Sequence, residues 1–179
     1  MWHKDLDANK YLRFNATSAQ TTGSGYFPSG CSTATTFQIG SDIAGVNGYD
    51  GWWDIYLYLF SGVESHSKFG TFEGNGLSDG PFIYTGFRPR FIMIKSIDDA
   101  YAWYIHDTAR SPYNYSDNEL VADTSGAEYS VSGAGGGERL DILSNGFKHR
   151  TSNSAMNQSS RTHIYAAFAE SPFKYANAR

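Results

Sequence analysis

The chain has 179 residues, of which 18% are charged and 16% aromatic, and its formal net charge is −4. That length fits one domain or two small ones, and it suffices to bury a core without disulfides or metals. The negative charge argues against a nucleic-acid coat or a polybasic membrane patch, and no apolar run approaches the ~18 residues of a membrane span. Many Tyr, Phe, Gly and Ser residues with few charges favour a β-rich protein over a helical bundle.

Short segments that are aromatic or β-branched and bounded by Gly, Asn, Asp or Ser recur along the chain, as is typical of β-strands. In chain order the predicted strands are Tyr11–Phe14, Thr35–Ile39, Asp54–Phe60, Phe82–Thr85, Phe91–Lys95, Ala102–His106, Leu140–Leu143, Phe147–His149 and His163–Ala169. Both faces of Asp54–Phe60 are apolar or aromatic, which predicts a central strand. The dipeptide Asn145-Gly146 is typical of a tight hairpin turn. No segment has a convincing amphipathic helical pattern, so the sequence predicts an all-β antiparallel sandwich.

The sequence also contains signs of an internal duplication. Ala8–Gln20 aligns without a gap on Ser116–Glu128 at an offset of 108 residues, and Phe37–Asn47 aligns on Phe147–Asn157 at an offset of 110. This predicts an incomplete first repeat over residues 1–62, a connecting segment over 63–80 and a complete second repeat over 81–179, packed as one sandwich. The first repeat lacks counterparts of the strands before Trp103. Either the chain is a fragment of a longer protein, or another subunit supplies strands by β-augmentation.

Enzymatic chemistry finds little support in the sequence. A glycosidase needs two carboxylates about 5–10 Å apart across a cleft. The candidates for a glycan depolymerase are Asp50, Asp54, Glu64 and Glu73, but they form no paired motif and are better explained as turn residues. The single cysteine, Cys31, has no neighbouring His, and the glycine-rich stretch Gly133–Gly137 lacks the Lys-Ser/Thr of a phosphate loop. We therefore predict no catalytic residues and no cofactor.

Calcium is the one metal that the sequence suggests, and only weakly. Asp5, Asp7 and Asn9 alternate like the oxygen ligands of a calcium loop. However, Lys10 stands where an EF-hand has Gly, and Ala16 stands where it has Glu. The sequence therefore predicts no metal site, with Asp5, Asp7 and Asn9 as the residues to inspect.

Aromatic residues in loop-like stretches are the best candidates for ligand binding. Tyr113, Asn114 and Tyr115 lie in a Ser-Pro-Tyr-Asn-Tyr-Ser stretch, and Trp52 and Trp53 form an adjacent pair. Exposed aromatic side chains beside Asn and Ser suit the recognition of glycans or protein partners. The alternative is that the tryptophans belong to the core.

Longer motifs point to a family. They are Ser67–Gly76 (SKFGTFEGNG), Gly80–Pro89 (GPFIYTGFRP), Trp103–Asn114, Leu143–Ser152 (LSNGFKHRTS) and Tyr165–Tyr175. Together they resemble segments of structural proteins of tailed bacteriophages, with a dense match from about residue 55 to residue 179. The resemblance implies a concanavalin A-like jelly roll, no catalytic residues, and a place in a tail fibre or other part of the virion. Family members usually have an attachment region upstream of the segments matched here, so we do not expect residues 1–179 alone to attach to the virion.

From the residues and this resemblance we expect a non-enzymatic virion module, assembled in the bacterial cytoplasm, that binds a host-surface glycan or protein. Its expected partners are other virion proteins and copies of itself, as a trimer or larger assembly, with no nucleic acid and no membrane insertion. The alternative is a self-assembling capsid decoration or filament subunit that exchanges strands with its neighbours.

Overall fold

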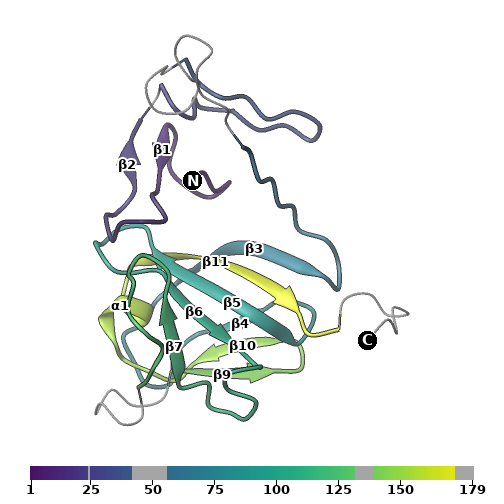
Figure 1. Cartoon of the computed structure of the whole chain (residues 1–179), viewed down its shortest axis with the longest axis vertical. Helices are drawn as coiled ribbons and strands as arrows, with labels where there is room; N and C mark the ends of the chain where they lie inside the picture. The colour runs from purple at the N-terminus through teal and green to yellow at the C-terminus, as the bar shows by residue number, and fades with distance from the viewer. Residues whose placement is uncertain (24, 42–55, 132–138, 172–179) are drawn as a thin grey trace.

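Two antiparallel β-sheets pack face to face beneath a small N-terminal lobe (Figure 1). The computed structural model describes residues 1–23, 25–41, 56–131 and 139–171. The larger sheet has the order β3 (Ser67–Glu73), β11 (Thr162–Ala169), β5 (Pro89–Ser96), β6 (Tyr104–Asp107), β7 (Asn118–Val121) and β8 (Tyr129–Ser130). The smaller sheet has the order β4 (Phe82–Tyr84), β10 (Gly146–His149) and β9 (Leu140–Leu143). The predicted all-β antiparallel sandwich is confirmed, whereas the jelly-roll topology and the duplication stay predictions.

The core lies between the two sheets and follows from the alternation of side chains along each strand. In β5, Ile92 and Ile94 are fully buried and point toward the smaller sheet, where Phe147 of β10 is also fully buried. The predicted hairpin of β9 and β10 is present, but Gly146 already pairs with Leu143, so its two-residue turn is formed by Ser144 and Asn145. The core residues are Ile83, Phe87, Ile92, Ile94, Leu140, Ile142, Phe147, Met156, Tyr165 and Ala167.

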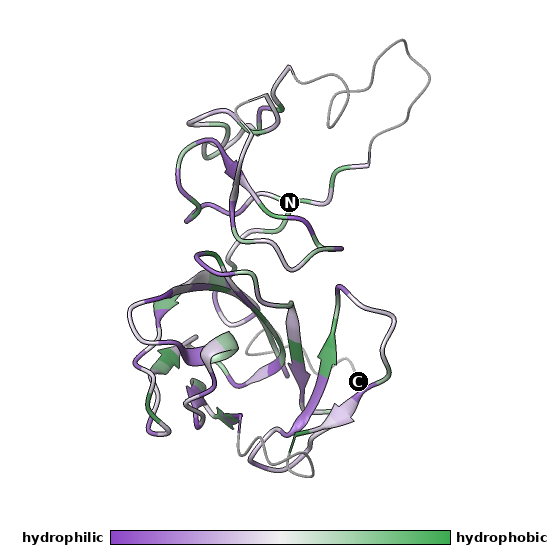
Figure 2. Ribbon diagram, turned by 90° about the vertical axis from the view of Figure 1, so that its left-hand side faces the viewer, coloured by the Kyte–Doolittle hydropathy of each residue, from purple (hydrophilic) through white to green (hydrophobic). Residues whose placement is uncertain are grey.

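The N-terminal lobe covers part of the outer face of the larger sheet (Figure 2). It contains the two-residue strands β1 (Lys10–Tyr11) and β2 (Thr21–Thr22). Leu12 of the lobe packs with Trp103 and Ile164 of the sandwich, and the Trp103 indole donates a hydrogen bond to the carbonyl oxygen of Arg13 at 2.9 Å. The lobe is therefore joined to the sandwich by a hydrophobic contact of its own.

A buried lysine strengthens this junction. Lys95 of β5 is fully buried, and its ammonium group donates hydrogen bonds to the carbonyl oxygens of Ser96 at 2.6 Å and Thr17 at 3.1 Å. Burial lowers the pKa of Lys95 to about 8, although Asp123 and Asp99 favour the charged form. Since Thr17 belongs to the lobe, Lys95 ties the lobe to the sheet by a charge-assisted hydrogen bond.

Helical structure in the described ranges is confined to α1 (Ser154–Asn157), which Asn153 caps by accepting a hydrogen bond from the Ala155 N–H. The fully buried Asn157 at its end donates to the carbonyl oxygens of Leu77 and Thr151 and accepts from the Asn75 N–H. This side chain thereby fixes the turn that follows β3. Within the described ranges, no helix has the length and hydropathy that crossing a membrane would require.

Two strand predictions were wrong. The described part of Asp54–Phe60, residues 56–60, is exposed and forms no strand, so it is not central. Thr35–Ile39 contributes only an isolated bridge between Ser32 and Phe37. Apolar composition on both faces favours burial, but among the described residues no strand pairs with residues 56–60.

Strands were also missed, because their sequences look like loops. Residues 63–80, expected to connect the repeats, contain β3, which pairs with β11 over seven positions. Its Lys68, Gly70 and Glu73 conceal the strand pattern, since these residue types are depleted in strands. The other missed strands are β2, β7 and β8.

Two histidines lie in the core against the same phenylalanine. Phe72 of β3 stacks on His163 of β11 with ring centroids 5.0 Å apart, and its centroid lies 4.6 Å from that of His149 of β10. Both imidazoles are fully buried. Burial holds the pKa of His149 well below its ordinary value, an effect that the neighbouring His163 and His106 reinforce, and burial also lowers the pKa of His163.

We therefore predict that stability falls on mild acidification. An unfolded histidine binds a proton near pH 6.5, whereas the folded form resists protonation until a lower pH. The free energy of unfolding therefore keeps its full value above pH 6.5. Below that pH, each such histidine lowers it by about 1.4 kcal/mol per pH unit. Replacing His149 by Leu should reduce this slope by about that amount, as measured by urea unfolding between pH 8 and pH 5. The difference between variant and wild type should be constant above pH 7.5, and an unchanged slope below pH 6.5 would contradict the assignment.

Candidate functional site

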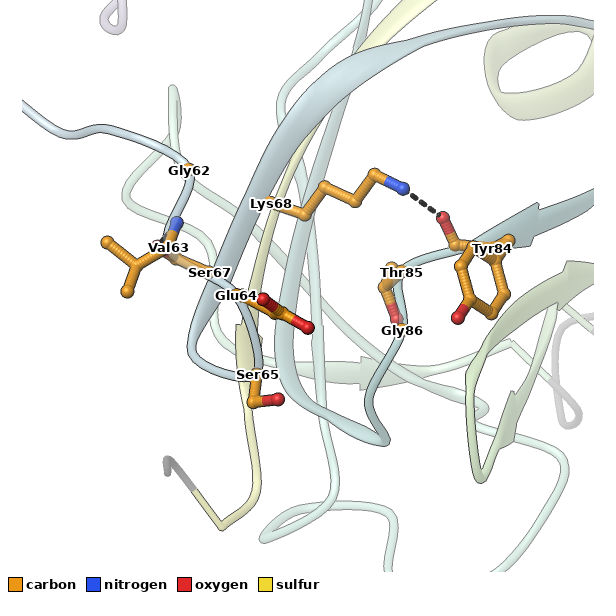
Figure 3. Close-up of a pocket in the computed structure, with 9 residues that line it drawn as sticks. All are labelled: Gly62, Val63, Glu64, Ser65, Ser67, Lys68, Tyr84, Thr85 and Gly86. Atoms are coloured by element: carbon orange, nitrogen blue, oxygen red, sulfur yellow. Dashed lines mark hydrogen bonds between the residues drawn. The ribbon is translucent and has the colours of Figure 1, made fainter. Parts of the chain in front are cut away.

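A cleft opens at one edge of the sandwich, where the edge strands of the two sheets face each other. One wall is the turn into β3, and the other is the end of β4 (Figure 3). The cleft has a volume of about 350 Å³ and is lined by Gly62, Val63, Glu64, Ser65, Ser67, Lys68, Tyr84, Thr85 and Gly86. We call it the edge cleft.

The first wall is a tight turn fixed by its own backbone. Val63 and Ser67 exchange two backbone hydrogen bonds of 2.9 and 3.0 Å, and the Ser67 hydroxyl donates to the carbonyl oxygen of Ser61 at 2.9 Å. Ser65 adopts a positive φ of 60° at the tip of the turn. These bonds hold Glu64 and Ser65 at the mouth of the cleft, and Figure 3 shows the Glu64 carboxylate pointing toward the opposite wall.

The second wall presents an aromatic ring. Tyr84 is 59% exposed, and the Lys68 ammonium group reaches across the cleft to donate a hydrogen bond of 2.8 Å to its carbonyl oxygen. The same ammonium group lies 5.1 Å from the centre of the Tyr84 ring, within the range of a cation–π contact. Gly86, with a φ of +88°, turns the chain directly after this ring and leaves its edge uncovered. Thr85 and Gly86 both donate backbone hydrogen bonds to Asn145, so this wall is anchored on the β9–β10 hairpin.

The edge cleft therefore combines one ring face with a carboxylate, an ammonium group and a hydroxyl. A sugar ring offers C–H groups that pack on an aromatic face and hydroxyls that both donate and accept hydrogen bonds. The cleft matches that chemistry on a scale suited to one or two sugar units.

The predicted depolymerase residues do not meet in this cleft. Glu64 lines it, whereas Glu73 ends β3 and does not, and Asp50 and Asp54 lie outside the described residues. Among the described lining residues, Glu64 is the one carboxylate. The two flanking carboxylates of a glycosidase are not assembled there.

The predicted ligand-binding aromatics have different environments. Trp52 and Trp53 lie outside the described residues. Tyr113 is 84% exposed, whereas Tyr115 is half-buried. Asn114 serves the fold, because its side chain donates to the carbonyl oxygen of Ile142 at 3.1 Å and accepts from the Ile142 N–H at 2.9 Å. It thus bonds to β9 as a neighbouring strand would, and its role in binding stays a prediction.

The weak calcium candidates are engaged in separate interactions. Asp5 pairs with Lys4 at 2.7 Å, Asp7 accepts a hydrogen bond from the Gln20 side chain, and Asn9 accepts from the Ser29 N–H. Across the described ranges, no group of three or more His, Cys, Asp or Glu is placed to hold a metal ion.

The sequence did not reveal a buried polar cluster between β6, β7 and β9. Glu119 of β7 is fully buried, with one oxygen 3.4 Å from His106 Nε2 and 3.6 Å from Arg139 Nε, while the Tyr129 hydroxyl donates to its other oxygen. His106 Nδ1 lies 3.3 Å from the Ser116 hydroxyl. This Ser–His–Glu order resembles a relay, but all three side chains are fully buried, so it serves stability and offers no nucleophile to a substrate.

The protonation of this cluster follows from its contacts. Burial alone would raise the pKa of Glu119, but hydrogen bonds from His106 and Tyr129 and the charge of Arg139 outweigh it and lower the pKa. Burial and the bond to Glu119 raise the pKa of Tyr129. Glu119 is therefore the anion of the cluster. The sequence signal for this cluster was a charged residue, Glu119, at an inward-facing position of a strand. It could not be used because β7 was not predicted.

The edge cleft was missed for a related reason. Its walls come from residues 62–68 and 84–86, which are close only because β3 and β4 occupy the same edge of two different sheets. The Gly-Phe-Arg-Pro and Ser-Lys-Phe-Gly motifs flank these walls, which is the one signal that the sequence offered.

Comparison with known proteins gives a family. No curated protein and no solved structure matches the chain. A family described as a domain of unknown function (DUF7483) matches residues 1–172, which include both sheets and the edge cleft. Since this match spans nearly all of the 179 residues, the chain belongs to the DUF7483 family.

Proposed function

We propose that this chain is a non-enzymatic structural module of a bacteriophage virion, in a tail fibre or similar appendage, and that it binds a host-surface glycan in the edge cleft. The sequence resemblance to tailed-phage structural proteins supports the virion assignment. The observation that carries the binding assignment is the cleft itself, where the exposed Tyr84 ring lies beside Lys68 and Glu64.

Each lining side chain has a role in this proposal. The Tyr84 ring packs on the C–H face of a sugar, and the Glu64 carboxylate and Ser65 hydroxyl bond the sugar hydroxyls. Lys68 is held in place by the carbonyl oxygen of Tyr84, so its remaining N–H groups are oriented toward the cleft. A single shallow site binds weakly, and several copies on one appendage raise the avidity.

The test is a glycan-binding screen of the full chain, followed by titration of the best ligand against Tyr84→Ala. We expect affinity to fall about ten-fold, equivalent to about 1.4 kcal/mol for one lost ring contact. The bond from Lys68 is kept, because it is made to the backbone of residue 84. Stability should change by less than ~0.5 kcal/mol, since the ring is largely exposed.

Tyr113→Ala is the matched control, because Tyr113 is at least as exposed and does not line the cleft. Its affinity should equal that of wild type. If Tyr113→Ala weakens binding and Tyr84→Ala does not, the site lies in the loop around Asn114. If no glycan binds, the binding assignment is wrong.

A further inference from the structure

Residues 56–60, which we call the arm, expose an unusual amount of apolar surface. The exposed fractions are 79% for Tyr56, 48% for Leu57, 79% for Tyr58, 62% for Leu59 and 67% for Phe60. In Figure 1 the arm belongs to the blue segment that descends beside the N-terminal lobe to the start of β3. With three aromatic and two leucine side chains so exposed, the arm presents on the order of 600–800 Å² of surface to solvent.

That area includes backbone atoms and tyrosine hydroxyls, so its apolar part lies near the upper end of what a monomer usually leaves exposed. The largest apolar patch of a typical monomer is about 300–600 Å², and one partner of a standard protein interface buries about 800 Å². The arm alone therefore approaches the contribution of one subunit to a stable dimer.

The arm runs as an extended chain outside the sheets of the described residues (Figure 1). Within the described ranges, none of its residues makes a backbone hydrogen bond. Its end is nevertheless fixed, because Phe60 lies 6.0 Å from Phe168 and 6.3 Å from Phe69, two rings on the outer face of the large sheet. The chain also continues directly into the bonded turn at Val63. An anchored, extended segment whose N–H and C=O groups have no partner among the described residues has the properties of an edge strand.

The sequence of the arm is complementary to itself. Read in either direction, Tyr56-Leu57-Tyr58-Leu59-Phe60 gives aromatic, leucine, tyrosine, leucine, aromatic. In an antiparallel pair centred on Tyr58, each leucine faces a leucine and each aromatic ring faces an aromatic ring. Aromatic pairs opposite each other are among the stabilising cross-strand pairs of antiparallel sheets.

We propose that the arm is a dimerisation strand, which pairs antiparallel with the arm of a second copy of this chain about a two-fold axis at Tyr58. Such an interface is isologous, because the same patch serves both subunits. It gives the backbone N–H and C=O groups of both arms hydrogen-bond partners, and it covers the exposed aromatic rings and leucine side chains. The edge cleft lies beyond the arm, at residues 62–68 and 84–86, so this inference goes beyond the proposed glycan binding and does not depend on it.

Disulfide trapping of the full chain tests the pairing and its direction. In the proposed dimer, residue 58 lies directly opposite its copy, with Cα atoms about 4.5–5.5 Å apart, within the range that a disulfide bridges. Residue 56 lies opposite residue 60 of the other copy, so the two copies of residue 56 are about 13 Å apart, too far for a disulfide. The native Cys31 is buried and does not compete.

Three single variants are compared under mild oxidation: Tyr58→Cys, Tyr56→Cys and Tyr113→Cys. Tyr113 is the control, since its exposed fraction of 84% matches the 79% of both arm tyrosines. We expect Tyr58→Cys to give at least about ten times more linked dimer than either other variant, because facing thiols have a high effective concentration. Equal linking of Tyr58→Cys and Tyr113→Cys would overturn the proposal, and strong linking of Tyr56→Cys would replace it by a parallel assembly, such as a trimer.

The solution mass of the unmodified chain gives the second readout, by size exclusion with light scattering. Wild type should be a dimer, and Leu57→Asp with Leu59→Asp should be a monomer with an unchanged melting temperature, because both leucines are exposed in the single chain. A wild-type monomer at concentrations of about 100 μM would exclude an interface of micromolar affinity and overturn the proposal.

Discussion

Replacing Glu119 by Gln is expected to lower the free energy of unfolding by about 3–5 kcal/mol, a large part of the stability of a domain of this size. Among the described residues, Glu119 is the anion that faces both His106 and Arg139, and it accepts a hydrogen bond from the Tyr129 hydroxyl. Gln keeps the shape but removes the charge, so the nearly buried Arg139 is left without its counter-ion. Thermal unfolding should move down by about 10 °C.

The matched control is Glu170→Gln. Glu170 pairs with Arg88 at 2.7 Å, but both side chains are about one-third exposed, so this change should cost less than ~1 kcal/mol. Acidification gives a second check, because the lowered pKa of Glu119 means that its contribution is present above about pH 4.5 and is lost as pH falls through the folded pKa. The difference between wild type and Glu119→Gln should therefore shrink below that pH. Equal costs for the two substitutions would show that the buried cluster is not a stabilising unit.

The second large effect is expected at Trp103, where Ala should cost about 3–5 kcal/mol. Trp103 is 1% exposed and packs between Leu12 of the lobe and Ile164 of the sheet. Its loss leaves a cavity and removes the hydrogen bond from its indole to Arg13. Because these contacts join the lobe to the sandwich, the lobe should lose protection from hydrogen exchange before the sandwich does.

Phe14→Ala is the control for this substitution. Its ring stacks on Trp103 with centroids 4.6 Å apart, but Phe14 is 47% exposed, so we expect a cost of about 1 kcal/mol. Hydrogen exchange and urea unfolding of both variants would check the expectation. If Trp103→Ala exposed lobe and sandwich amides equally, the two parts would have to unfold as one unit.

Sequence patterns predicted the fold class well because local rules determine it. The Asn145-Gly146 dipeptide located the β9–β10 hairpin to within one residue of its turn, and β5 and β11 follow from their apolar runs. The same rules failed at residues 56–60, where apolar composition predicted a buried strand. Composition indicates that a segment prefers burial, but it does not indicate whether other residues of the same chain pack over it.

The sites were harder to predict, because they depend on which strands become neighbours. Glu119 and His106 lie 13 positions apart in sequence, and their pairing needs the register of β6 on β7. Tyr84 and Lys68 meet only once the two sheets have been stacked. The hydrogen bonds of Asn114, a binding candidate from the sequence, to the backbone of Ile142 were likewise not visible in the sequence.

The position of β11 determines how the sandwich responds to mechanical load. This strand is paired on both sides, with β3 from Thr162 to Phe168 and with β5 from His163 to Ala169. A pull along the residues that follow β11 acts along the strand axis, whereas the ladder hydrogen bonds run perpendicular to it. Both ladders are then loaded in shear, with all their bonds strained together instead of opening one after another. Tension applied at this point enters an interior strand of the large sheet, so β11 is suited to transmit force without being peeled away.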